Sequence, residues 1–183
     1  ESRIQPAILN PIEAVTKNCV GTCTVLQCSR EAGVKKVIYS STSSGYGFNE
    51  SPNHENQPDD CLNPYSVSKV AGEKLCKMYN DLFGLKTIIF RYFNVYGERS
   101  PVRGQYAPVM SIFENQKRNS EPLTIIGDGY QTRDFVHVSD VVLANIFASQ
   151  RELKNYGEVY NVGTGKGIEI KEIADLISHY QMS

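Results

Sequence analysis

Tyr65 and Lys69 are the residues whose types and spacing first suggest chemistry. They lie in the stretch NPYSVSKVAGEKL, residues 63–75, which is predicted to open a helix behind a loop that contains proline. Side chains four residues apart on a helix share one face, so the phenol and the ammonium can act at one site. A nearby cation favours the phenolate and would move the tyrosine pKa from about 10 toward the neutral range. Without further motifs, however, a tyrosine and a lysine with this spacing are more often a surface lysine whose stem packs on the tyrosine.

A run of hydroxyl side chains supplies a third candidate group. The stretch VIYSSTSSGYG, residues 37–47, ends a predicted strand in serines and a threonine. Such a run after a strand is usually only a loop. Beside Tyr65 and Lys69, however, a hydroxyl can bond the same substrate oxygen and help to pass its proton. Hydroxyl, phenol and ammonium together suit the removal of a proton from an alcohol while a hydride leaves its carbon.

Alternating strands and helices must position these groups. Strands are predicted at residues 34–41, 86–93, 123–127, 134–138 and 158–163. Helices are predicted at residues 11–32, 64–83, about 106–118, from Ser139 or Asp140 onward, and about 169–180. This alternation indicates βαβ units, an α/β fold and a mostly parallel sheet. Such sheets bind ligands beyond the carboxyl ends of their strands, here the loops after Ser41 and Phe93 and around Gly127.

Composition narrows the class of protein. A net charge of −1 with 21% charged residues argues against a protein that binds nucleic acid by neutralising phosphates. No apolar run approaches the roughly 20 residues that span a bilayer, so no membrane partner is expected. The five cysteines form no C-x-x-C pair, and neither they nor the three histidines have metal-ligand spacing. We therefore expect reduced cysteines, no metal site and a cytoplasmic protein.

Five linked motifs follow one another along the chain. They are NCVGT (18–22) before AGVKKVIYSS (32–41), the Ser/Thr cluster that follows, Y-x-x-x-K on the next long helix, RYFNVYG (91–97) and TRDFVHVSDV (132–141). Together they resemble the extended short-chain dehydrogenase/reductase family, and within it the nucleotide-sugar epimerases of the UDP-glucose 4-epimerase type. The resemblance covers essentially the whole chain. It implies part of a Rossmann-type doubly wound parallel sheet, most of a smaller substrate-binding α/β region, and NAD as the cofactor.

The resemblance also implies roles for individual residues. Tyr65 matches the family's catalytic base, Lys69 matches its partner that also holds the nicotinamide ribose, and Thr42 matches the catalytic hydroxyl, with Ser41 as the alternative. The expected cofactor contacts are Asn18, Ser40, Ser41, Tyr65, Lys69, Tyr92 and Phe93. The expected substrate contacts are Thr42, Asn94, Gln105, Thr124, Ile125, Ile126 and Arg133.

Several of these assignments have an equally simple structural explanation. Tyr92 and Phe93 also fit as core aromatics, and Asn18 fits as a polar residue on a helix face. The forked guanidinium of Arg133 suits a diphosphate, but the adjacent Asp134 could hold it in an ion pair. The loop GTGKG (163–167) lacks the full phosphate-binding patterns and is expected to be structural.

Parts of the family pattern are missing. The glycine-rich turn and the acidic residue for the adenosine ribose would precede Glu1, and a segment that contacts the diphosphate would follow Ser183. We therefore expect about half of such an enzyme, truncated at both ends. Residues 1–98 would be the C-terminal part of the NAD-binding Rossmann domain, with the catalytic Tyr and Lys. Residues 99–183 would be mainly the substrate-binding region, with returning elements at about 134–150 that pack on the Rossmann part. Alone, the chain is expected to bind NAD weakly.

The leading hypothesis is a homodimeric 4-epimerase of a nucleotide-diphosphate sugar, with a UDP-sugar favoured. The alternatives are a 4,6-dehydratase or decarboxylase of the same family, or an inactive binding fragment. In the dehydratases that the chain resembles, Asp-Glu follows the catalytic hydroxyl, whereas Ser43 and Ser44 follow Thr42 here. A serine is no base near pH 7 without an activating neighbour, so epimerisation is favoured. The dimer interface is expected on the helices at 11–32 and 64–83.

Overall fold

The computed structural model describes residues 1–101 and 107–179, which belong to two compact units. Unit 1 comprises Glu1–Phe93 and Val141–Val162, and unit 2 comprises Asn94–Asp140 and Gly163–Ser183. Residues 94–98, expected in the first domain, fall in unit 2 because the chain leaves the first sheet at Phe93. None of the helices in the described ranges is long and apolar enough to cross a membrane.

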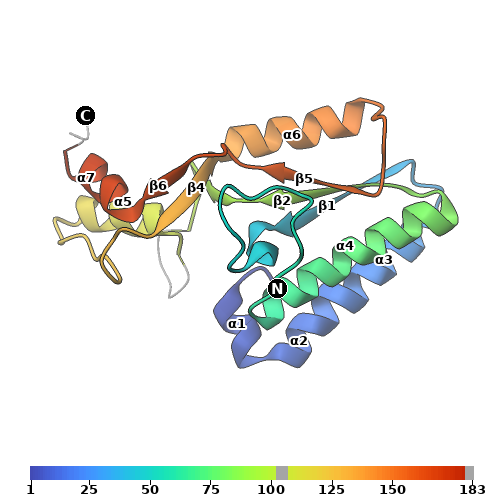
Figure 1. Cartoon of the computed structure of the whole chain (residues 1–183), viewed down its shortest axis with the longest axis horizontal. Helices are drawn as coiled ribbons and strands as arrows, with labels where there is room; N and C mark the ends of the chain where they lie inside the picture. Colours follow the sequence, from blue (N-terminus) through green and yellow to red (C-terminus); the bar gives the residue numbers. More distant parts are fainter. Residues whose placement is uncertain (102–106, 180–183) are drawn as a thin grey trace. The chain divides into compact units, whose positions relative to one another are not determined.

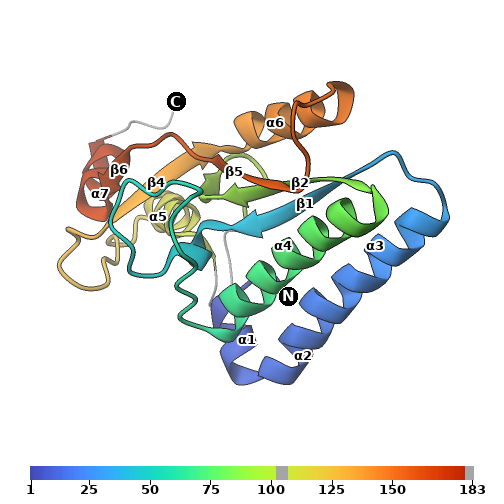
Figure 2. The same cartoon turned by 45° about the vertical axis from the view of Figure 1, so that its right-hand side comes forward.

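Unit 1 is built on a parallel sheet with helices on both faces. Its strands β1 (Lys36–Thr42), β2 (Lys86–Tyr92) and β5 (Glu158–Val162) lie in the order β1-β2-β5. Helices α3 (Gly21–Glu31) and α4 (Pro64–Phe83) cover one face, and the Val141–Gln150 part of α6 (Val138–Gln150) covers the other (Figures 1 and 2). The expected Rossmann-type α/β arrangement is confirmed.

Local signals at both ends explain why α4 has the predicted bounds. Asn63 accepts a hydrogen bond from the Ser66 backbone and Ser66 reciprocates, which forms a capping box before the first turn. Pro64 occupies the first helical position, where its missing N–H costs nothing. Gly84 ends the helix in the left-handed conformation, with φ 69°. The inner face then packs on the sheet in a cluster of Leu26, Cys76, Tyr79, Leu85 and Ile89.

The helical segment before β1 is interrupted. Helix α1 (Ile4–Leu9) is followed by α2 (Pro11–Val15), whose N-terminus is capped by Asn10. A π-helical stretch, Thr16–Val20, joins α2 to α3. The predicted helix at 11–32 is thus helical almost throughout, with a widened turn at its centre. All five cysteines are free thiols.

Unit 2 contains short strands and two helices around a second apolar cluster. Strand β3 (Asn94–Tyr96) pairs in parallel with β4 (Thr132–His137), and β4 pairs antiparallel with β6 (Gly167–Glu169). Helices α5 (Val109–Arg118) and α7 (Ile170–His179) contribute to the cluster of Phe113, Phe135, Ile170, Ile173 and Ala174. The sequence pattern did not predict β3 and β6, because three residues are too few to show a period.

Two sequence predictions for unit 2 and its border were wrong. Residues 123–127 form no strand, because the Thr124 backbone N–H donates to the Gln116 side chain (3.1 Å) instead of to another strand. Helix α6 begins at Val138, before the expected caps Ser139 and Asp140.

Candidate active site

The carboxyl edge of the unit 1 sheet carries two rows of side chains. The register pairs Thr42 with Tyr92 and Tyr92 with Val162. One residue earlier on each strand, it pairs Ser41 with Arg91 and Arg91 with Asn161. Successive residues of a strand point to opposite faces, so the two rows serve different sides of the sheet. This edge is where open parallel sheets bind ligands.

The two candidate hydroxyls have different surroundings. The Ser41 hydroxyl is buried and donates to the carboxylate of Glu73. The Thr42 hydroxyl lies at the strand end, where it accepts from the Ser44 backbone N–H and donates to the Ser44 hydroxyl, both at 3.1 Å. Ser44 belongs to a short 3-10 helix, Ser43–Tyr46, that turns the chain directly after β1. Of these two hydroxyls, that of Thr42 is the one that acts on Tyr65, on the first turn of α4.

Tyr65 is half-buried on that first turn and differs from expectation in one respect. Burial raises the pKa of Tyr65, and a hydrogen-bonding interaction with the Thr42 side chain acts in the opposite direction but does not outweigh it. The expected lowering by Lys69 is not found. The Lys69 ammonium instead lies over the ring of Tyr39, with Nζ 4.4 Å from the ring centroid.

Lys69 has the properties of a group that can hold a sugar hydroxyl. Burial lowers the pKa of Lys69, while the neighbouring Cys76 and Glu73 act to raise it. Within residues 1–101 and 107–179, no side chain or backbone carbonyl accepts a hydrogen bond from Lys69 Nζ. A half-buried ammonium with free donors can hold hydroxyl groups such as those of a sugar.

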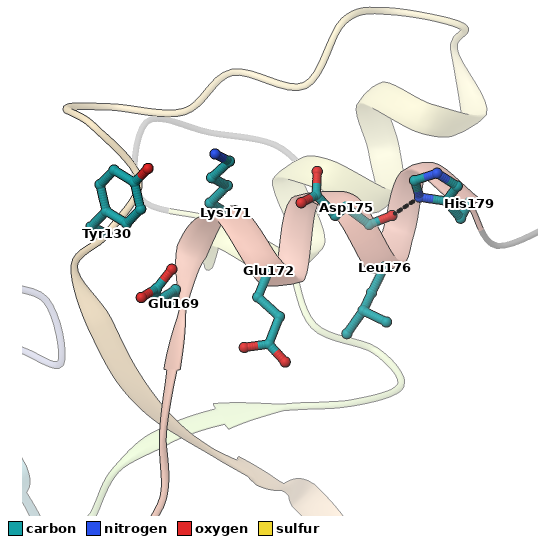
Figure 3. Close-up of a pocket in the computed structure, with 7 residues that line it drawn as sticks. All are labelled: Tyr130, Glu169, Lys171, Glu172, Asp175, Leu176 and His179. Atoms are coloured by element: carbon teal, nitrogen blue, oxygen red, sulfur yellow. Dashed lines mark hydrogen bonds between the residues drawn. The ribbon is translucent and has the colours of Figure 1, made fainter.

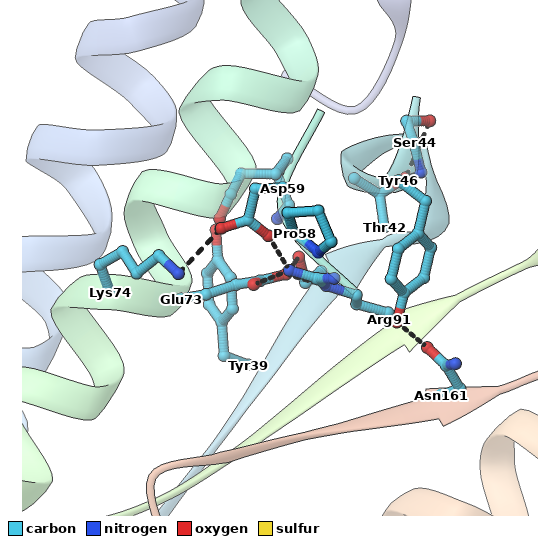
Figure 4. A network of polar contacts seen from close by, with 12 residues as sticks. Tyr39, Thr42, Ser44, Tyr46, Pro58, Asp59, Glu73, Lys74, Arg91 and Asn161 are labelled. Carbon is cyan, nitrogen blue, oxygen red and sulfur yellow. Dashed lines mark hydrogen bonds and ion pairs between the residues drawn. The ribbon is translucent and has the colours of Figure 1, made fainter. Parts of the chain in front are cut away.

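A buried network of ion pairs includes Arg91, one residue before the end of β2 (Figure 4). Arg91 Nε donates to Glu73 Oε1 at 2.9 Å and Arg91 Nη2 to Glu73 Oε2 at 2.6 Å, and both residues are 2% exposed. Arg91 Nη2 also contacts Asp59 Oδ1 (2.6 Å), and Lys74 Nζ lies 2.8 Å from Asp59 Oδ2. The Arg91 guanidinium stacks 4.6 Å over the Tyr46 ring. The network joins β1, β2, α4 and the loop before α4.

Sequence reasoning missed this network, although its spacing was visible. Tyr39 and Ser41 are two apart on a strand, and Lys69 and Glu73 are four apart on a helix. Each pair therefore lies on one face of its element. Where those faces meet, Tyr39 lies against Lys69 and Ser41 against Glu73.

The other expected cofactor residues of unit 1 make contacts within the protein. Asn18 is buried and donates to the Ser68 hydroxyl at 2.9 Å. The Tyr92 hydroxyl exchanges hydrogen bonds with the Asn145 side chain on α6 (2.8 and 3.2 Å). The Phe93 N–H donates to the Val162 carbonyl (3.1 Å), and Ser40 is exposed. Their roles toward a cofactor stay predictions.

In unit 2, Asp134 does not pair with Arg133. The Asp134 carboxylate accepts hydrogen bonds from the Thr164 N–H (2.9 Å) and hydroxyl (2.7 Å) and from the Gly165 N–H (2.8 Å), so it holds the GTGKG loop. Arg133 is exposed, and its Nη1 donates to the Thr132 carbonyl at 2.8 Å. The guanidinium has no carboxylate partner in the part of the chain that the structure describes.

The remaining substrate candidates of unit 2 are dispersed. Asn94 Nδ2 donates to the Asp134 carbonyl (2.9 Å) and so ties β3 to β4. Thr124 is exposed, Ile125 packs against the unit 2 cluster, and Ile126 is 84% exposed. Gln105 lies outside the described residues.

A hollow of about 520 Å³ beside α7 contains none of the predicted residues (Figure 3). Its lining is Tyr130, Glu169, Lys171, Glu172, Asp175, Leu176 and His179. With three carboxylates in that lining, this hollow does not suit an anionic nucleotide diphosphate.

Comparison with known proteins identifies related sequences and folds. The family described as "NAD dependent epimerase/dehydratase family" matches residues 1–163. A putative UDP-glucose 4-epimerase of Methanocaldococcus jannaschii is 39% identical over 96% of this chain and 57% of that protein. A UDP-N-acetyl-alpha-D-glucosaminuronate decarboxylase of Bacillus cytotoxicus is 39% identical over 89% of this chain and 51% of that protein.

A solved structure shares the fold. The UDP-N-acetylglucosamine 4-epimerase of Methanobrevibacter ruminantium, in complex with UDP-N-acetylmuramic acid, superposes with a TM-score of 0.92 at 31% identity. That match covers 97% of this chain and 56% of the other. The chain thus spans about half the length of the relatives it matches.

Proposed function

The chain belongs to the NAD-dependent epimerase/dehydratase family, and on that premise we propose that the whole protein is a cytoplasmic UDP-sugar 4-epimerase. One observation carries the proposal. The Thr42 hydroxyl interacts with Tyr65 at the carboxyl edge of the parallel sheet, and the competing hydroxyl, Ser41, is bound to Glu73. A phenol and a hydroxyl at that edge can handle the proton of one sugar alcohol.

Tyr65, Thr42 and Lys69 each have one task in the proposed reaction. The Tyr65 oxygen accepts the proton of the sugar C4 hydroxyl and returns it after the sugar has presented its other face. The Thr42 hydroxyl bonds the same sugar oxygen, and the Lys69 ammonium holds the nicotinamide ribose hydroxyls. When bound, NAD supplies the acceptor for the C4 hydride and gives it back. Because burial raises the pKa of Tyr65, turnover should increase with pH across the neutral range, since only the phenolate accepts a proton.

The surroundings of Thr42 favour epimerisation over elimination. The next two residues, Ser43 and Ser44, carry no ionisable side chain. The two carboxylates of the buried ion network are already paired. Glu73 is bound to Arg91 and Ser41, and Asp59 is bound to Arg91 and Lys74. Both carboxylates are therefore occupied by cationic donors. Burial acts to raise the pKa of Asp59, but these partners hold that pKa below its usual range, so Asp59 is a weak base.

Recognition of the diphosphate is assigned to Arg133. It is exposed, its guanidinium lacks a carboxylate partner within the described ranges, and a forked guanidinium matches phosphate oxygens. Asn94 is a second substrate contact, since only one N–H of its amide is used by Asp134.

Product mass tests the proposal. The whole protein is incubated with NAD and UDP-glucose, UDP-N-acetylglucosamine or UDP-glucuronic acid, and the products are analysed by mass spectrometry and NMR. An epimerase yields a product of unchanged mass that differs at C4. Loss of water would indicate a dehydratase.

Decarboxylation is the second candidate function, because a decarboxylase is among the relatives at 39% identity. It predicts carbon dioxide release from a UDP-uronic acid. The same mass measurement separates it from epimerisation.

We also infer a homodimer through α2, α3 and α4. Apolar side chains on these helices are exposed, including Ile12 at 80% and Val25 at 59%. Leu75 and Met78 are half-buried against the unit 1 cluster and would contribute little. Light scattering should give twice the chain mass, and Val25→Asp should shift it to the monomer mass.

A further inference from the structure

Tyr39 makes two contacts with one residue of α4. Its ring lies under the Lys69 ammonium, 4.4 Å from Nζ to the centroid, and its hydroxyl donates to the Lys69 backbone carbonyl at 3.2 Å. One side chain thus engages both ends of the same lysine. A cation over the face of an aromatic ring is attracted by the ring's quadrupole, more strongly when water is partly excluded.

Gly72 is the feature of α4 that admits this ring. A Cβ at Gly72 would lie 2.1 Å from the Tyr39 hydroxyl oxygen and 2.5 Å from Cζ, closer than any real contact. Glycine is among the poorest helix formers, and here it lies inside a twenty-residue helix. A close approach of Tyr39 gives a reason for a glycine at this position.

The proposed role of Lys69 makes this contact functional. The ammonium has a hydrogen-bonding function toward the ribose, and its long stem would otherwise have many conformations. We propose that Tyr39 is a positioning residue whose ring seats the Lys69 ammonium at the sheet edge, a role that rests on the proposed function. Gly72 is the complementary gap in α4 that lets the ring reach it.

The charged and titratable groups around this contact can be named. Glu73 and Cys76 act on Lys69 from its own helix. From the segment before β1, Thr22 acts to lower the pKa of Tyr39 and Cys19 acts to raise it. Burial raises the pKa of Tyr39, so its phenol is neutral and presents an intact ring face to the ammonium.

Three substitutions separate the ring from the hydroxyl and from general packing. Tyr39→Phe keeps the ring, and Tyr39→Leu removes it. Gly72→Ala keeps every contacting side chain but fills the gap. Tyr160→Leu is the matched control, because Tyr160 is a half-buried tyrosine of the same sheet that packs on Phe90, away from Lys69.

The first measurement is the reactivity of the Lys69 amine in the chain itself. Trace labelling with acetic anhydride across pH 6–11 is quantified by peptide mass spectrometry, relative to the exposed Lys77 on the same helix. The pH midpoint reports the loss of the ammonium's proton, and the plateau reports exposure. Loss of the ring should move the midpoint to lower pH and increase labelling below the midpoint about two- to five-fold. Tyr39→Phe and Tyr160→Leu should leave the midpoint in place.

The second measurement is turnover in the whole protein. Tyr39→Leu and Gly72→Ala should reduce kcat about ten-fold or more, because a displaced group loses its alignment, whereas Tyr39→Phe should retain most of it. An unchanged midpoint in both Tyr39→Leu and Gly72→Ala would overturn the proposal, as would an equal effect of Tyr160→Leu. If Tyr39→Leu does not fold, Gly72→Ala decides alone. If the labelling midpoint of Lys69 shifts in Tyr39→Leu but the whole protein has no epimerase activity, the result would support the positioning of Lys69 by Tyr39 and refute the proposed function.

Discussion

Removing Arg91 should destabilise unit 1 far more than removing another cation from the same strand. Arg91 and Glu73 are each 2% exposed, and Arg91→Met would leave the Glu73 carboxylate buried with only the Ser41 hydroxyl as a donor. Removing one partner of a buried ion pair lowers the free energy of unfolding by about 3–5 kcal/mol. Since domains are stable by about 5–15 kcal/mol, this single change would remove a large share of the stability.

Lys86→Met is the matched control. Lys86 also lies on β2 and pairs with Glu152 at 2.6 Å, but the two side chains are 43% and 74% exposed. Water screens such a pair, so its loss should hardly change the urea midpoint. The double substitution Arg91→Met/Glu73→Met should recover much of the loss, since apolar side chains can replace both buried charges.

Urea unfolding of the four proteins, followed by circular dichroism, gives the free energy of unfolding of each. The expected order of stability is wild type and Lys86→Met, then the double variant, then Arg91→Met. An Arg91→Met protein as stable as Lys86→Met would refute the view that the network is a buried, paired unit.

Three further predictions concern the hydroxyls, the base and acid stability. Ser41→Ala should lower the free energy of unfolding by about 1.5–3 kcal/mol, the usual worth of a hydrogen bond to a charged group. Thr42→Val removes only neutral hydrogen bonds with Ser44, so it should lower the free energy of unfolding less, and it should reduce turnover of the whole protein. Tyr65→Phe and Lys69→Met should each reduce kcat, the former by about 10²–10⁴-fold, without changing the circular dichroism spectrum. Burial acts to raise the pKa of Asp59, but its two cationic partners outweigh it and hold the pKa below 3.8. Asp59 therefore stabilises the fold above pH 3.8, and this stabilisation is lost as the pH falls through the lower pKa of Asp59 in the folded chain. Asp59→Asn should make the free energy of unfolding depend less on pH in this acid range.

Local signals explain which elements were predictable. Helix α4 has the predicted bounds because Asn63, Pro64 and Gly84 act through their own neighbours. Strands β1 and β2 each contain a short apolar run, Val37–Tyr39 and Ile88–Phe90, which is typical of strands covered on both faces. The run at 123–127 has the same composition, but Gln116, at the end of another helix, takes the Thr124 N–H. No pattern within the run could reveal that partner.

The sequence by itself determined most of the longer elements and the short list of groups that can do chemistry: Tyr65 and Lys69 on one helical face, and Ser41 or Thr42 at a strand end. Only the tertiary structure decided which hydroxyl is bound to a carboxylate, because Ser41 meets Glu73 where β1 packs on α4. It likewise placed the Lys69 ammonium over Tyr39, so that burial and not a nearby cation dominates the pKa of Tyr65. The physical reason is distance along the chain. These partners are about thirty residues apart, and they meet only when strand and helix faces, each set locally by its own period, are packed together.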